Sequence, residues 1–63
     1  MKLNKEKCDQ AMLNSFNNYT SIAKETGLTY AAVHKILTGK ANPRPSSLKA
    51  VCEVLKCSPN DLI

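Results

Sequence analysis

The chain has 63 residues and a formal net charge of +4, and 43% of its residues are hydrophobic, so it holds one small domain. A chain of this size buries only about 60% of the surface that it exposes when unfolded, so its stability must be modest. It is also too short to form a barrel, a doubly wound sheet or a deep catalytic cleft. Its apolar runs are too short to cross a membrane and no secretory segment is recognisable, so we expect a cytoplasmic protein without membrane association.

The first expected helix covers about residues 4–15. Its apolar stripe, at helical spacing, consists of Cys8, Ala11, Met12 and either Ser15 or Phe16. The asparagine-rich stretch 14–18 favours a break in the chain, because asparagine competes with the helix through its own backbone hydrogen bonds.

Two short helices follow, separated by a tight turn. The second is expected at 19–26, with Asn18 as its N-cap, and it ends at Gly27. The third is expected at 30–38, with Thr29 as its N-cap, and it ends before Gly39. Its inner face consists of Val33, Ile36 and Leu37.

The fourth helix, expected at 46–56, has the clearest pattern of the chain. Its apolar stripe consists of Leu48, Val51, Cys52 and Leu55. It opens either with Pro45 in its first turn or with Ser46 as cap. A last turn is expected at 59–62, with Ser58 and Asp61 forming a capping box. No segment alternates apolar and polar residues, so the fold class is all-α, a compact domain of four to five helices.

The cysteines do not indicate a disulfide framework or a metal site. Cys8, Cys52 and Cys57 are odd in number, and the single histidine, His34, is remote from all three. A zinc site needs two close-spaced ligand pairs, and the chain has at most one. We therefore interpret the cysteines as buried free thiols that act as small hydrophobes, and expect neither a metal nor a cofactor.

The positive charge is concentrated in the middle of the chain. Residues 1–25 have a balance of +1 and residues 53–63 a balance of −1, whereas residues 26–52 contain no acid and have a balance of +4. The four cations of this middle segment are Lys35, Lys40, Arg44 and Lys49. An acid-free basic stretch in so small a domain favours a polyanionic partner over an ordinary solvated face.

A set of six residues predicts which surface of the chain contacts that polyanionic partner. Its members are Ile22, Ala23, Gly27, Leu28, Val33 and Ile36. A small residue lets two helices cross closely, a glycine makes the turn, and the apolar residues fill the wedge between the helices. This is the helix-turn-helix pattern, which holds the outer face of its second helix where it can enter the major groove of DNA. A helical hairpin used only for packing is the competing interpretation.

The stretch 22–62 resembles the phage repressor and Cro type of helix-turn-helix domain, the XRE family, whose fold is that of lambda repressor. The matching positions are Ile22-Ala23, Gly27-Leu28-Thr29, Val33, Ile36, Gly39-Lys40, Pro43, Leu48, Val51, Leu55, Ser58 and Leu62. The resemblance implies a five-helix domain that binds a palindromic DNA operator as a homodimer, in transcriptional control, usually repression, of a phage, mobile element or bacterial operon. Three positions depart from the family pattern, with Tyr19 in place of Gln, Leu37 in place of Glu, and no Arg near Met12.

The motif and the resemblance together assign roles to individual residues. Reading of bases is assigned to Tyr30, Ala31, His34 and Lys35, of which Ala31 suits a thymine methyl and Lys35 either a guanine or a phosphate. Contacts to the DNA backbone are assigned to Asn18, Tyr19, Thr20, Thr29, Thr38, Lys40, Asn42 and Arg44. Tyr19 has the alternative of only covering the hairpin. Leu62 and Ile63 either form a dimer contact or close the core.

Other classes of function fit the sequence less well. An enzyme is not expected, because the acids are scattered, no nucleophile accompanies His34, and no glycine-rich phosphate loop exists. RNA binding is disfavoured by the small number of aromatic residues that could stack on bases. The main alternative is a protein-interaction module such as an antirepressor or antitoxin, whose signature is an exposed apolar patch.

Overall fold

The apolar stripes become the inner faces of five helices in the computed structural model, which describes residues 2–63. In chain order these are α1 (Lys5–Asn14), α2 (Tyr19–Thr26), α3 (Tyr30–Leu37), α4 (Pro45–Leu55) and the 3-10 helix η1 (Pro59–Leu62). No strand occurs within the described residues. The prediction of an all-α domain is therefore confirmed.

Three of the four α-helices begin with a side-chain cap. The Asn4, Asn18 and Thr29 side chains accept the N–H of the residue three positions later, over 2.8–3.1 Å. These bonds satisfy N–H groups that the first turn of a helix leaves without a partner. α4 differs, because Pro45 is its first residue and the N-cap, Arg44, makes no side-chain capping bond.

Glycine ends the two helices of the hairpin in the left-handed conformation. Gly27 and Gly39 both have φ of 77°. At the end of α3 the Lys40 N–H donates to the Lys35 carbonyl over 2.9 Å, the bond of a Schellman motif. A Cβ on Gly39 would lie 2.7 Å from the carbonyl oxygen of Leu3, whereas one on Gly27 would meet nothing within 4 Å. Gly39 is thus required twice, by its φ and by close packing.

The first helix ends earlier than its apolar stripe suggested. The Asn17 N–H donates to the Met12 carbonyl over 2.8 Å, which places Phe16 in the left-handed conformation with φ of 56°. Its side chain is 94% exposed, so Phe16 is not the one of the two alternative residues that continues the stripe. Ser15 takes the partly buried position instead, with its hydroxyl donating to the Ala11 carbonyl over 2.8 Å.

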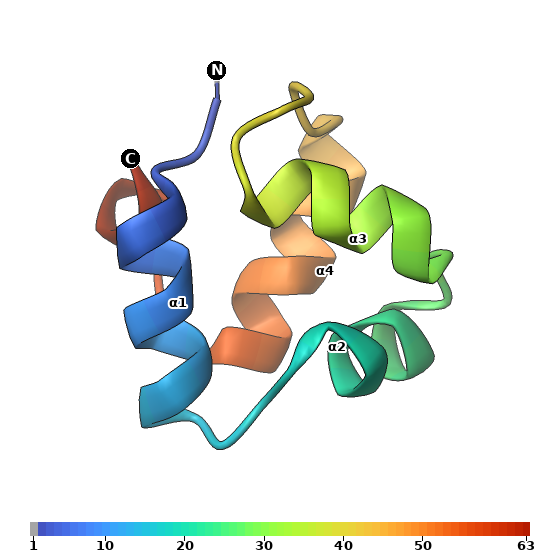
Figure 1. Cartoon of the computed structure of the whole chain (residues 1–63), viewed down its shortest axis with the longest axis horizontal. Helices are drawn as coiled ribbons and strands as arrows, with labels where there is room; N and C mark the ends of the chain where they lie inside the picture. The colour runs from blue at the N-terminus through green and yellow to red at the C-terminus, as the bar shows by residue number, and fades with distance from the viewer. Residues whose placement is uncertain (1) are drawn as a thin grey trace.

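The core lies where the helices converge, and α4 passes behind α3 and packs against α2 (Figure 1). Its buried side chains are Leu3, Cys8, Met12, Ile22, Val33, Ile36, Leu37, Leu48, Val51, Cys52, Leu55 and Leu62. Leu28, one of the apolar residues expected to fill the wedge between the helices of the hairpin, is only partly buried. Leu62 closes the core beside α1, where the Asn4 N–H donates to its carbonyl over 2.6 Å, and Ile63 remains 43% exposed. None of the helices in the described residues has the length and apolar character needed to cross a membrane.

Candidate nucleic-acid interface

The α2–α3 pair forms the hairpin that the six-residue constellation predicts. Ile22 and Val33 are completely buried between the helices, and Gly27 turns the chain. Thr26 is a polar residue in the last turn of α2. Its hydroxyl donates to the Ile22 carbonyl over 2.7 Å, so the polar group has a partner within its own helix. The hairpin therefore tolerates threonine at this position.

Packing of one face of α3 leaves the opposite face outside. Val33 and Leu37 have no exposed surface and Ile36 has 7%. Because these three residues point inward, Tyr30, Ala31 and Lys35 are exposed and His34 is partly exposed. The four residues assigned to base reading thus share the outer side of one helix.

Three aromatic rings gather at the start of this outer face. Tyr19, the first residue of α2, meets His34 edge-on with ring centroids 5.1 Å apart, and meets Tyr30 edge-on at 6.0 Å. Tyr30 and His34, one helical turn apart, are stacked with 20° between their planes. Burial raises the pKa of Tyr19, so its hydroxyl remains protonated and able to donate a hydrogen bond.

A groove of about 410 Å³ runs between α3 and the loop that follows it. Five predicted site residues line it, namely Thr29, Ala31, Lys35, Asn42 and Arg44. The loop is held against α3 because the N–H groups of Lys40 and Ala41 both donate to the Lys35 carbonyl, over 2.9 and 3.2 Å. This groove brings two of the residues assigned to base reading together with three of those assigned to the DNA backbone.

The remaining predicted residues lie around these two clusters. Asn18 uses its side-chain oxygen to cap α2, and Thr20 is exposed on the first turn of the same helix. The Thr38 hydroxyl donates to the His34 carbonyl over 2.6 Å, so it is already occupied within α3. Lys40 is exposed in the loop.

Comparison with known proteins settles the family. The family model of the Cro/C1-type helix-turn-helix DNA-binding domain matches residues 9–63. The chain belongs to this family. DNA binding by the helix-turn-helix, which the sequence predicted, is thereby supported. No curated protein and no solved structure matches the chain.

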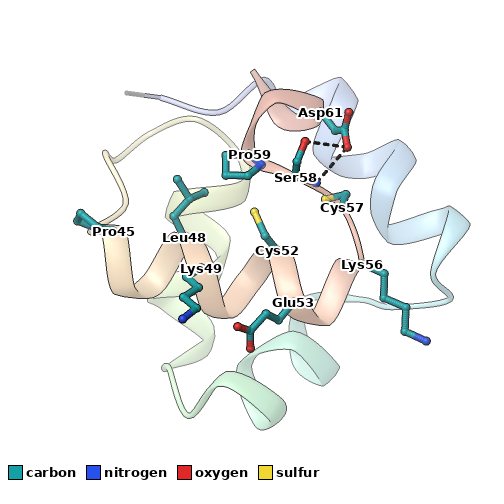
Figure 2. A pocket seen from close by; sticks show the side chains of 10 residues that line it. All are labelled: Pro45, Leu48, Lys49, Cys52, Glu53, Lys56, Cys57, Ser58, Pro59 and Asp61. Atoms are coloured by element: carbon teal, nitrogen blue, oxygen red, sulfur yellow. Dashed lines mark hydrogen bonds between the residues drawn. The ribbon is translucent and has the colours of Figure 1, made fainter.

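The Cro/C1-type domain carries a second groove, of about 750 Å³, along α4 and η1 (Figure 2). Its walls include Leu48, Lys49, Cys52, Glu53, Lys56 and Pro59. Lys49, which belongs to the acid-free segment of the sequence, thus lies on the α4–η1 surface rather than in the groove beside α3. None of the residues assigned to DNA lines the second groove.

The thiols of the domain are poorly suited to nucleophilic chemistry. Burial raises the pKa of Cys8 and of Cys52 to about 11, and it also raises the pKa of Cys57. Neutral thiols neither attack nor ligate readily. Among the residues that the structure describes, no three His, Cys, Asp or Glu side chains are grouped to hold a metal.

Proposed function

We propose that the chain is a sequence-specific transcriptional regulator, a repressor of a phage, mobile element or bacterial operon, which binds a palindromic duplex operator as a homodimer. In this proposal α3 enters the major groove. The observation that carries the proposal is the outer face of α3, where four exposed or partly exposed side chains lie in a segment without acids. Such a face does not repel the negatively charged duplex, and it offers hydrogen-bond donors and apolar groups to base edges.

Base reading is assigned to the outer face of α3. Lys35 is exposed and reaches the O6 and N7 atoms of guanine or a phosphate, and the Ala31 methyl group suits a thymine methyl. Tyr30 presents its phenolic hydroxyl, and His34 presents its two ring nitrogens, one a donor and the other an acceptor when the ring is neutral. These side chains supply the choice of sequence.

The surrounding residues are assigned to phosphates. Asn18, Tyr19 and Thr20 surround the N-terminus of α2, whose dipole and N–H groups favour an anion. Thr29 and Thr38 flank α3, where the Thr38 hydroxyl gives up its bond to the His34 carbonyl when it meets a phosphate, and the loop adds the contacts of Lys40, Asn42 and Arg44. Each phosphate that is neutralised changes the slope of log K against log salt by about 0.9 in duplex DNA.

The homodimer follows from the small reading surface of one subunit. A single α3 reaches only a few base edges, and a palindromic site doubles the contacts. Ile63 is 43% exposed, and its carbonyl accepts a hydrogen bond from the Lys7 ammonium over 2.7 Å, which holds Ile63 against α1. We assign the contact between copies to the surface around Ile63.

The deciding experiment is selection of bound duplexes from a random pool at low salt, followed by titration of the recovered sequence. We expect a defined half-site repeated with inverted symmetry. Lys40→Ala and Arg44→Ala should weaken binding to all sequences and lower the salt slope, whereas Lys35→Ala should change the preferred sequence. Lys49→Ala removes the same charge from the α4–η1 surface and is the matched control. Recovery of no preferred duplex would reject the proposal.

A protein-interaction module remains the second candidate because two large apolar side chains are open to solvent near the end of α1. Leu13 is 69% exposed and Phe16 is 94% exposed. Exposed apolar side chains that form a contiguous patch are typical of a docking site. An antirepressor or antitoxin would bind its protein partner without duplex DNA, and Phe16→Ala would abolish that binding while leaving the duplex titration unchanged.

A further inference from the structure

The three rings at the junction of α2 and α3 form one unit. The Tyr19 ring is edge-on to both others, with centroids 5.1 Å from His34 and 6.0 Å from Tyr30. The Tyr30 and His34 rings are stacked, with centroids 6.2 Å apart. Edge-to-face and offset-stacked pairs are the favoured arrangements of aromatic rings. Movement of any one ring therefore breaks a contact with both others.

The ring of Tyr19 anchors this unit to the core. Tyr19 is partly buried against the core, whereas Tyr30 is 53% exposed. An exposed tyrosine on a helix normally samples several rotamers and loses that freedom on binding, at a cost in affinity. Here Tyr19 holds the Tyr30 ring before any partner arrives. The contact with Tyr19 favours one position of the Tyr30 ring, so part of the cost of ordering is met during folding.

The unit and Ala31 bring apolar surface to the outer face of α3. Tyr30 and Ala31 are both exposed in the first turn of α3, about 100° apart around the helix as consecutive residues, and the segment 26–52 contains no carboxylate. In the major groove the C5 methyl of thymine is the one apolar group that distinguishes a base pair. The Tyr30 ring offers that methyl an apolar surface held by its two aromatic neighbours, and the Ala31 methyl adds apolar surface one position further along the helix.

We infer that the Tyr19–Tyr30–His34 unit, together with Ala31, reads the C5 methyl of a pyrimidine, and that Tyr19 is the positioning residue that makes the reading selective. The inference rests on the proposed entry of α3 into the major groove. It assigns to Tyr19 a role beyond contact with the DNA backbone. The ligand class is a thymine, or a 5-methylcytosine in the same place, in each half-site.

The test works with an operator of any sequence. Selection is run in parallel from a random thymine pool and from the same pool built with deoxyuridine, which lacks only the methyl group. The recovered thymine duplex is then titrated with one thymine at a time replaced by deoxyuridine. We expect one thymine of each half-site to lose about fourfold in affinity, the value of one buried methyl group. A 5-methylcytosine at that position should bind more tightly than cytosine.

The variants separate positioning from folding. Tyr30→Ala should remove the preference for thymine over deoxyuridine. Tyr19→Leu keeps an apolar side chain against the core but removes the ring edge, so the preference should fall while the melting temperature and the salt slope change little. Tyr19→Phe keeps the ring and should retain the preference. Lys40→Ala, the control, should weaken the thymine and deoxyuridine duplexes by the same factor.

Each outcome bears on one of the two proposals. Equal binding of thymine and deoxyuridine duplexes by the unaltered chain overturns the methyl-reading inference and leaves DNA recognition intact. A preference that survives in Tyr30→Ala or in Tyr19→Leu assigns the methyl to Ala31 alone and overturns the role of the ring unit. Failure to recover any duplex from either pool rejects the proposed function itself.

Discussion

Residues on the inner side of α3 and residues on its outer side are subject to different constraints, although they alternate along the same helix. Val33 and Leu37 have no exposed surface, while Tyr30, which lies about one turn before Val33, is 53% exposed. The inner side chains meet neighbours on all sides, so their shape is set by packing. The outer side chains meet solvent or one another, so their chemistry is free to suit a partner. The same contrast between filled and open surroundings recurs at the helix ends and among the cysteines.

The largest expected effect is the loss of an inner side chain. Leu37→Ala should destabilise the domain by about 3 kcal/mol, within the usual cost of truncating a buried leucine. A domain this small has a stability of only a few kcal/mol, so the variant should be mostly unfolded at 25 °C. Urea unfolding followed by circular dichroism measures this.

Lys35→Ala is the matched control for this variant, on the outer side of the same helix. Exposed substitutions of this kind usually change stability by less than about 0.5 kcal/mol. Equal destabilisation by both substitutions would contradict the division of α3 into a packing face and a free face.

The second effect compares the two glycines of the hairpin, which share a φ of 77°. Gly27→Ala should cost about 1 kcal/mol, because only the left-handed backbone opposes a Cβ there. Gly39→Ala should cost at least about 2 kcal/mol, because its Cβ would also lie 2.7 Å from the Leu3 carbonyl oxygen. Urea midpoints of the two variants provide the measurement. Equal costs would show that the segment around Leu3 moves aside freely.

Local signals predicted most of the fold. The stripe of Leu48, Val51, Cys52 and Leu55 and the caps Asn18 and Thr29 follow from spacing alone, and the structure buries the first set and forms both capping bonds. Each of these features involves residues within one or two helical turns. Periodicity and capping chemistry describe such neighbours well.

Features that join distant segments were not predicted. Tyr19 meets Tyr30 and His34 only because α2 crosses α3, and no spacing along the chain encodes that meeting. Phe16 leaves the α1 stripe because a backbone bond from Asn17 to Met12 reverses the chain, which residue type alone did not indicate. The sequence grouped Lys49 with the cations of the basic segment 26–52. In the structure the direction of α4 places Lys49 in the groove between α4 and η1 instead of the groove beside α3.

A third, smaller effect concerns pH and the buried thiols. Burial raises the pKa of Cys8 and Cys52 from the ordinary value of 9.0 to about 11. Above pH 9 the unfolded chain therefore releases protons that the folded chain keeps, so the free energy of unfolding falls as pH rises. By pH 10 each thiol should contribute a loss of about 1 kcal/mol.

The measurement is urea unfolding at intervals from pH 8 to pH 10. Cys52→Ala has one thiol fewer, so its stability should decline less steeply over this range than that of the unaltered chain. Below pH 8 the unaltered chain and Cys52→Ala should show the same dependence of stability on pH, because the thiols of Cys8 and Cys52 are protonated in the folded and in the unfolded state. A decline that is unchanged in Cys52→Ala would show that other groups cause it.

The smallest expected effect is a stabilisation of the domain, and it arises at a solvent-exposed position. Phe16 has a φ of 56° and is 94% exposed, so its side chain contributes little packing while its backbone is strained. Phe16→Gly relieves that strain but adds freedom to the unfolded chain, and the balance should stabilise the domain by about 0.5 kcal/mol. Leu13→Ala, exposed on the neighbouring helix, should leave the urea midpoint unchanged. Destabilisation by Phe16→Gly would instead mean that the ring packs in solution, which would remove it from the open surface available to a protein partner.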